Sequence, residues 1–133
     1  MNINRSAIEL DILAATIYAE ARGESREGQL WVGWVIKNRA KKYRGYWGGD
    51  KIKSVCLHPN QFECWNGRNF IMIEENDAWC KVVSVANEVL GNDHDPTNGC
   101  DHYNNPSKEG YPEWTRNVTK VKIIGNHHFY KGY

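Results

Sequence analysis

Residues 6–24 of the chain read Ser-Ala-Ile-Glu-Leu-Asp-Ile-Leu-Ala-Ala-Thr-Ile-Tyr-Ala-Glu-Ala-Arg-Gly-Glu, and this stretch predicts an amphipathic helix. Ser6 followed by Glu9 is typical of a capping box, which would start the helix. Apolar side chains then recur three to five residues apart, at Ile8, Ile12, Leu13 and Ile17. Gly23 suits the C′ position, where a helix ends.

Glu20 is the most informative residue of this helix, because it continues the apolar face. Leu13, Ile17 and Glu20 are four and three residues apart and share one side of a helix. A carboxylate there is desolvated or faces a cleft, and the last turn of the helix adds negative potential. Both effects would raise its pKa, as a general acid near neutral pH requires. The alternative is that Glu20 reaches solvent or pairs with Arg22 or Arg26.

The rest of the chain predicts an α+β fold in one domain covering residues 1–133. The elements with clear boundary signals are a helix capped by Ser25 and running to about Lys42, a helix from Asp77 to Leu90 closed by Gly91, and a hairpin of residues 118–124 and 127–130. A short helix near residues 51–55 and a loop at 95–99 complete the pattern. The domain is therefore expected to be mainly helical with a small C-terminal β-hairpin.

Composition excludes several classes of protein. The chain has 41% hydrophobic residues and a net charge of +1, which argues against disorder and against a nucleic-acid partner. No apolar run approaches the roughly 18 residues of a membrane span, so no membrane insertion is expected. The first residues show no signal peptide, so synthesis in the cytoplasm is expected. Six Trp and seven Tyr indicate either an aromatic core or a groove that stacks on sugar rings.

The four cysteines are expected to be free, buried thiols, and no cofactor is expected. His94, Asp95, Cys100 and His102 lie close together in the sequence and could suggest a zinc amidase or peptidase. The chain has no H-E-x-x-H motif and no C-x-x-C pair, so metal catalysis is the weaker reading and no metal site is predicted.

Several motifs occur in order along the chain. They are IYAEARGE (17–24), EGQ (27–29), VGWVIKNR (32–39), QFECW (61–65), HYNNP (102–106) and IGNHHFY (124–130). Together they resemble the SleB-type cell wall hydrolases, the spore-cortex-lytic family, over roughly residues 10 to 130. The chain departs from the pattern at Trp34 and Lys37 and in the Gly- and aromatic-rich residues 43–51, which puts substrate details in question.

The resemblance implies a lysozyme-like catalytic domain that cleaves the β-1,4 bond between N-acetylmuramic acid and N-acetylglucosamine of bacterial peptidoglycan. It implies a lytic transglycosylase in which Glu20 is the single acid and base and the product is a 1,6-anhydro sugar. Glycosidases usually need two carboxylates, and among Glu24, Glu27 and Glu63 the spacing singles out no partner. The alternatives are a muramidase-type hydrolase of the same bond and a non-catalytic peptidoglycan-binding module.

Substrate-binding residues are expected around Glu20. The candidates are Glu24, Gln61, Phe62, Trp65, Tyr103, Asn104, Asn105, His127 and Tyr130. Trp65 and Tyr103 are the candidate sugar platforms, whereas Trp31 and Trp79 lie in helical apolar stripes and are assigned to the core. Asn104 and Asn105 could instead simply form a turn, and His127 could have a structural role. Glu24 could instead stabilise the amino end of the next helix through its negative charge.

Asn38 and Arg39 are interpreted as structural hydrogen-bond donors. A monomer that acts on the cell wall is expected. A phage endolysin released through a holin and a bacterial wall enzyme both fit these features.

Overall fold

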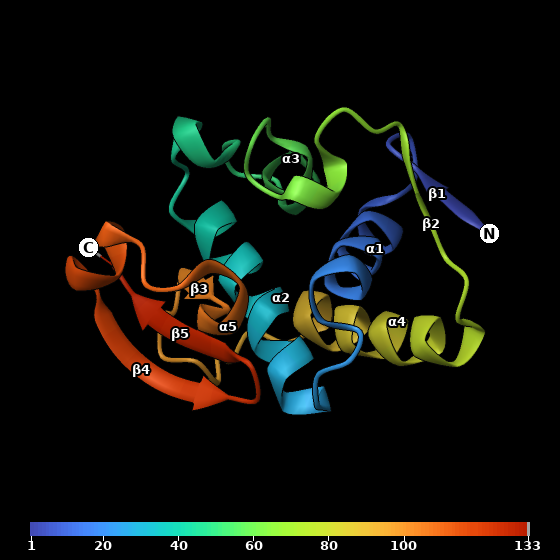
Figure 1. The fold of residues 1–133 in the computed structure, drawn as a ribbon. Coiled ribbons are helices and arrows are strands. Elements are labelled where there is room, and N and C mark those ends of the chain that lie inside the picture. Colours follow the sequence, from blue (N-terminus) through green and yellow to red (C-terminus); the bar gives the residue numbers. More distant parts are fainter. Residues whose placement is uncertain (133) are drawn as a thin grey trace.

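Helices α1 (Glu9–Ala21), α2 (Arg26–Lys41) and α4 (Asn76–Gly91) pack against one another in the computed structural model, which describes residues 1–132. Figure 1 shows α2 between the other two helices, α1 and α4, on one side and the C-terminal sheet on the other. The shorter helical elements are η1 (Gly45–Trp47), α3 (Ile52–Leu57), η2 (Glu63–Trp65), α5 (Pro106–Glu109) and η3 (Glu113–Arg116). The prediction of a mainly helical α+β fold is confirmed.

Two small antiparallel sheets complete the fold. Strands β4 (Thr119–Ile124) and β5 (His127–Lys131) form the predicted hairpin, and β3 (His102–Asn104) pairs with the other edge of β5. Strands β1 (Asn2–Asn4) and β2 (Phe70–Met72) form a separate pair. Strands β1, β2 and β3 were not predicted, because three residues are too few to show an alternating pattern.

The predicted helix boundaries are confirmed in part. The amide of Gly28 donates to Ser25 Oγ at 3.2 Å, so Ser25 caps α2 as expected. The capping box at Ser6 is wrong: α1 begins at Glu9, and no side chain caps its amino end. Residues 5–7 instead form a turn, in which the amide of Ala7 donates to the carbonyl of Asn4 at 2.9 Å and connects β1 to the helix.

Two other boundaries differ by one or two residues. Asp77 lies in the first turn of α4 rather than at its cap, which Glu75 occupies, and Gly91 is the last helical residue. Gly23 does follow the last turn of α1, but its backbone is not left-handed. No helix of the described chain is both long and apolar enough to cross a bilayer.

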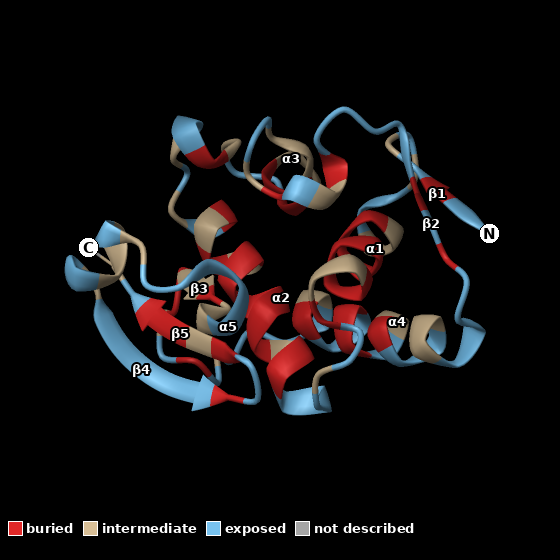
Figure 2. Cartoon of the chain, viewed as in Figure 1, coloured by how far each residue is buried: buried red, intermediate tan, exposed pale blue. Residues whose placement is uncertain are grey.

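The core lies between the three long helices and extends under the C-terminal sheet (Figure 2). Among its largest fully buried side chains are Trp34, Trp65, Phe129 and Tyr130. Trp31 is buried and Trp79 is half-buried against the core, as predicted for both.

Gly48 holds the segment after α2 against α3. Its φ is 104°, and a Cβ atom there would lie 2.5 Å from the carbonyl oxygen of Ser54. We expect Gly48→Ala to lower the free energy of unfolding by about 2–3 kcal/mol, because backbone strain and a clash with backbone add. Gly49→Ala is the control: its φ is 94°, but no atom lies within 4 Å of the added Cβ. Equal losses in urea unfolding of the two variants would contradict the clash.

Candidate active site

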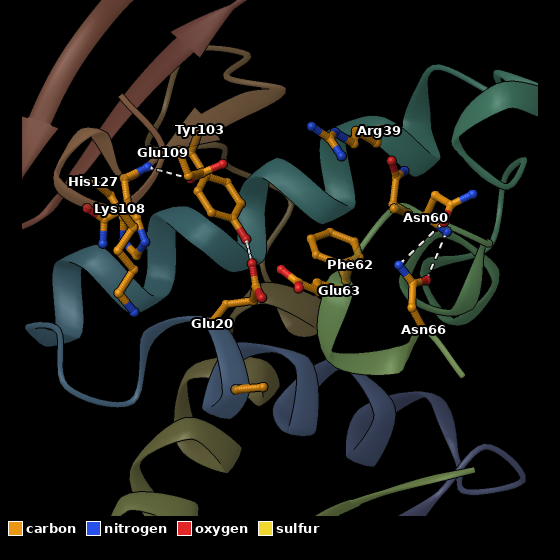
Figure 3. A pocket seen from close by; sticks show the side chains of 13 residues that line it. Glu20, Arg39, Asn60, Phe62, Glu63, Asn66, Tyr103, Lys108, Glu109 and His127 are labelled. Atoms are coloured by element: carbon orange, nitrogen blue, oxygen red, sulfur yellow. Dashed lines mark hydrogen bonds between the residues drawn. The ribbon is translucent and has the colours of Figure 1, made fainter. Parts of the chain in front are cut away.

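A pocket of about 700 Å³ opens where the end of α1 meets the loop at residues 60–66, β3, α5 and the start of β5 (Figure 3). Its lining residues are Ala19, Glu20, Arg39, Asn60, Gln61, Phe62, Glu63, Asn66, Tyr103, Asn105, Lys108, Glu109 and His127. Most of these side chains are polar and only Phe62 is a large apolar one. The pocket therefore suits a ligand rich in hydroxyl and amide groups.

Glu20 lies in the last turn of α1 and points into this pocket. The hydroxyl of Tyr103 donates a hydrogen bond to Glu20 Oε1. Burial raises the pKa of Glu20, because the charged carboxylate loses water, and the nearby carboxylates Glu109 and Glu63 raise the pKa further. The hydrogen bond from Tyr103 opposes the shift only in part. The raised pKa predicted from the helix pattern is confirmed, with burial as its main cause.

Tyr103 is held by its place in the sheet. It pairs with Phe129 in the β3–β5 register, and the edge of its ring meets His127 with the ring centroids 5.1 Å apart. Burial raises the pKa of Tyr103 well above its usual value, so its hydroxyl stays protonated and can donate to Glu20. Burial lowers the pKa of His127, which favours its neutral form, and His127 Nδ1 is buried with no partner among residues 1–132.

Charged residues of both signs border the pocket. Glu63 and Glu109 bring negative charge close to Glu20, while Arg39 and Lys108 bring positive charge. The Nε of Arg39 donates to the carbonyl of Asp101 at 2.7 Å, which confirms its structural role. Arg39 also lines the pocket, which the sequence analysis did not predict.

The structure brings six of the predicted site residues together in the pocket: Glu20, Gln61, Phe62, Tyr103, Asn105 and His127. Gln61 Nε2 donates to the carbonyl of Trp47 at 3.1 Å, and Asn105 Oδ1 accepts from the amide of Ser107 at 3.2 Å. The latter contact caps α5, so the turn chemistry considered for Asn105 is also present.

Four other candidates lie outside the pocket, and we no longer assign them to substrate binding. Trp65 is only 1% exposed, and its Nε1 donates to Thr16 Oγ1 in the core at 2.9 Å, so neither face of its ring can act as a sugar platform. Asn104 is fully buried, donating to the carbonyl of Gly110 and accepting from the buried hydroxyl of Tyr130, both at 2.9 Å.

Glu24 connects the α1–α2 loop to the β4–β5 turn. Its two carboxylate oxygens accept hydrogen bonds from the backbone amide and the side-chain amide of Asn126, each at 3.0 Å. This pairing joins residues 102 positions apart in the sequence. The structure thus gives Glu24 a structural contact in place of the predicted contact with substrate.

Several pocket residues were not predicted from the sequence, among them Asn60, Asn66, Lys108 and Glu109. Lys108 and Glu109 directly follow the HYNNP motif, and their position after Asn105 was the one available signal. Asn60 and Asn66 bracket the QFECW motif, and the backbone amide of Asn60 donates to Asn66 Oδ1 at 3.0 Å.

The loop considered for zinc binding is held by hydrogen bonds within the protein. Asp95 accepts from the backbone amides of Thr97 and Gly99 and from the side chain of Asn38, so Asn38 has its predicted structural role. No three His, Cys, Asp or Glu side chains within residues 1–132 are placed to share a metal ion.

The four cysteines are free, as predicted, but only Cys56 and Cys100 are buried. Cys64 is half-buried, and Cys80 is exposed on α4, which corrects the expectation that all four are buried.

Comparisons with known proteins agree with this arrangement. Residues 23–130 match the family described as cell wall hydrolase. The spore cortex-lytic enzyme of Oceanobacillus iheyensis is 30% identical over 128 residues, and that of Halalkalibacterium halodurans is 28% identical over 121 residues. These alignments cover 92% and 91% of the chain but only 41% and 34% of those relatives, so the chain spans less than half of their length.

Two solved structures share the fold over nearly their whole length. The catalytic domain of the germination-specific lytic transglycosylase SleB from Bacillus anthracis superposes with a TM-score of 0.72 at 25% identity, covering 92% of this chain and 93% of that one. The catalytic domain of Bacillus cereus SleB gives a TM-score of 0.68 at 26% identity, covering 92% and 89%. The chain therefore belongs to the cell wall hydrolase family.

Proposed function

We propose that this chain is a peptidoglycan-degrading enzyme that cleaves the β-1,4 bond between N-acetylmuramic acid and N-acetylglucosamine. Its relatives are spore cortex-lytic enzymes, and one similar structure is a lytic transglycosylase. The observation that carries the proposal is Glu20: a half-buried carboxyl whose pKa is raised, which accepts a hydrogen bond from Tyr103 and faces a polar pocket.

In the proposed reaction Glu20 is first an acid and then a base. The protonated carboxyl donates its proton to the glycosidic oxygen, so the bond from that oxygen to C1 of the muramic acid breaks. The C6 hydroxyl of the same muramic acid then closes on C1 and returns its proton to Glu20. The product is a 1,6-anhydro sugar, and no water is consumed. Because Tyr103 donates its hydrogen bond to Oε1, we assign the proton transfer to Oε2.

The pocket walls supply groups that suit an acetylated sugar chain. Side-chain amides come from Asn60, Gln61, Asn66 and Asn105, and such groups bind N-acetyl and hydroxyl groups without adding charge beside Glu20. Neutral His127 completes the wall next to Tyr103. We assign substrate binding to this polar set. Phe62 lines the pocket but is only 3% exposed, so it supports the wall from within the core.

A muramidase-type hydrolase is the second candidate, because the pocket holds further carboxylates. Glu63 and Glu109 both line it, and both lie near enough to raise the pKa of Glu20. Either could act as a base that activates water in an inverting reaction. Glu109 already accepts a hydrogen bond from the amide of Asn105 at 2.9 Å, so Glu63 is the stronger candidate.

The test is digestion of purified peptidoglycan. We expect loss of turbidity with release of glycan fragments that still carry their peptide stems. Release of free stems would identify an amidase instead, and loss of activity with a chelator would restore the metal alternative. Binding to the wall without loss of turbidity would identify a binding module and contradict the proposal.

We further propose that the chain acts at the bacterial cell wall, where its substrate lies. A phage endolysin that reaches the wall through a holin is the setting we propose. Expression in bacteria with and without a co-expressed holin tests this: lysis only with the holin supports it, and lysis without a holin contradicts it.

The proposal predicts a pH effect of Tyr103→Phe. The hydrogen bond from Tyr103 lowers the pKa of Glu20, so its loss should raise that pKa. Because the protonated form is the active one, the alkaline limb of the activity profile should move to higher pH. The maximal rate should fall about tenfold, because the carboxyl loses its orientation. A shift of the limb to lower pH would contradict the assigned role.

A further inference from the structure

His127 of β5 lines the pocket, yet its ring makes no hydrogen bond within residues 1–132. The residue is only 4% exposed, and its ring packs against those of Tyr103 and Phe129, with the centroids 5.1 and 6.0 Å away. Most buried polar nitrogen atoms in proteins have a hydrogen-bond partner, and leaving one without a partner costs stability. A buried histidine without a partner at the wall of a pocket therefore points to a partner that arrives with the ligand.

The two ring nitrogens of His127 differ in their surroundings. Nδ1 is enclosed by the protein, whereas Nε2 is not enclosed and is the ring nitrogen that a ligand in the pocket can reach. Burial lowers the pKa of His127, so the ring is neutral near pH 7 and carries one proton. Enclosed N–H groups without an acceptor are rarer in proteins than enclosed acceptors without a donor, so we assign this proton to Nε2. His127 then offers the pocket one hydrogen-bond donor and no charge.

His127 lies one side chain away from Glu20. The hydroxyl of Tyr103 donates to Glu20, and the ring of the same Tyr103 contacts His127. Figure 3 shows His127 at the end of the pocket where Lys108 and Glu109 lie. Nearby carboxylates and the ammonium group of Lys108 act on the histidine ring with opposite sign. This end of the pocket therefore suits a neutral group of the ligand better than an anion or a cation.

We propose that Nε2 of His127 donates a hydrogen bond to the carbonyl oxygen of the acetamido group beside the cleaved bond, and so makes the enzyme prefer N-acetylated strands. This inference rests on the proposed function and deepens it. The acetamido group stands on C2 of the muramic acid, next to the C1 atom at which the bond breaks, so Glu20 and His127 would contact adjacent parts of one sugar. Its carbonyl is a neutral acceptor, whereas a de-N-acetylated sugar carries an ammonium group, which cannot accept a hydrogen bond.

The experiment compares two substrates made from one glycan preparation: fully N-acetylated strands, and strands whose muramic acids have been de-N-acetylated by a deacetylase. The measured quantity is the ratio of kcat/KM for the acetylated to the de-N-acetylated strands. We expect the wild type to favour acetylated strands and His127→Phe to lower the ratio about three- to tenfold, the contribution of one hydrogen bond between neutral groups. Phe keeps a ring at this place but cannot donate. His127→Gln retains an N–H donor and should keep part of the preference.

His128→Phe is the matched control. His128 is the next residue of β5, and its Nδ1 is also buried without a partner in the described chain, but its ring packs against Tyr111 and does not line the pocket. This variant should leave the ratio unchanged. Any effect of de-N-acetylation on the reactivity of C1 itself is common to all variants and cancels when their ratios are compared. A His127→Phe ratio equal to that of the wild type, whatever the overall rate, would overturn the subsite.

Two measurements test the subsite without catalysis. Glu20→Gln protein should bind acetylated strands in preference to de-N-acetylated ones, and adding His127→Phe should remove most of that preference. Nitrogen-15 NMR of the imidazole should find its proton on Nε2, and a proton on Nδ1 would overturn the assigned donor. If wild-type protein cleaves neither strand but the binding preference depends on His127, the proposed reaction fails and the subsite stands. Cleavage of both strands with the same ratio in all variants would leave the reaction standing and the subsite refuted.

Discussion

Glu20→Gln is expected to reduce peptidoglycan clearing by about 10³-fold or more. Gln keeps the shape of the side chain but cannot donate or accept the proton that the reaction requires, and a positioned acid–base group contributes about 10² to 10⁴-fold. Tyr103 can still donate its hydrogen bond to the amide oxygen, so the pocket should keep its form. The measurement is the initial rate of turbidity loss, compared at equal concentrations of folded protein.

The same variant should be at least as stable as the wild type near neutral pH. The pKa of Glu20 is raised in the folded state, so the native protein is penalised once pH rises above the usual range of a carboxyl. A neutral Gln removes that penalty. Glu63→Gln is the matched control from the same pocket: under the transglycosylase mechanism it should retain most activity. Full activity in Glu20→Gln, or equal losses in the two variants, would contradict the assignment of Glu20 as the single acid and base.

Trp65→Ala is expected to lower the free energy of unfolding by about 3–5 kcal/mol, the usual cost of truncating a large buried aromatic residue. Trp65 is 1% exposed, and its indole donates to Thr16 Oγ1 at 2.9 Å. Its backbone carbonyl also accepts from the guanidinium of Arg5, which ties the amino-terminal segment to this loop. Thermal or urea unfolding, followed by tryptophan fluorescence, measures the loss.

Trp65→Phe separates packing from substrate stacking. It should keep most of the core contacts and lose the bond to Thr16, at a cost of about 1–2 kcal/mol, with KM for peptidoglycan unchanged. A sugar platform would show the reverse, a raised KM with normal stability. That result would restore the role first predicted for Trp65 and contradict its burial.

The local features of the site could be predicted from sequence because helices repeat regularly. The spacing of Leu13, Ile17 and Glu20 places the carboxyl on the buried face without knowledge of any other element. The cap at Ser25 could also be predicted from local sequence alone, because serine is a preferred residue at the amino end of a helix. Trp65 had no such signal: it lies in a three-residue 3₁₀ helix within an irregular segment, where nothing in the sequence states which way a side chain points.

The long-range contacts could not be predicted in the same way. Tyr103 reaches Glu20 across 83 residues because β3 pairs with β5 and thereby faces the end of α1. A three-residue strand carries too little pattern to reveal that pairing. For the same reason the sequence did not show that Asn104 turns inward to Tyr130 while its neighbour Asn105 faces the pocket.

The most direct test of the central claim is the mass of the products formed in water labelled with oxygen-18. If Glu20 directs the attack of the substrate's own C6 hydroxyl, the muramic acid end of each product is one water lighter than a hydrolysis product and carries no label. A muramic acid end of full mass with one oxygen-18 would show that water attacks C1, and would contradict the transglycosylase mechanism.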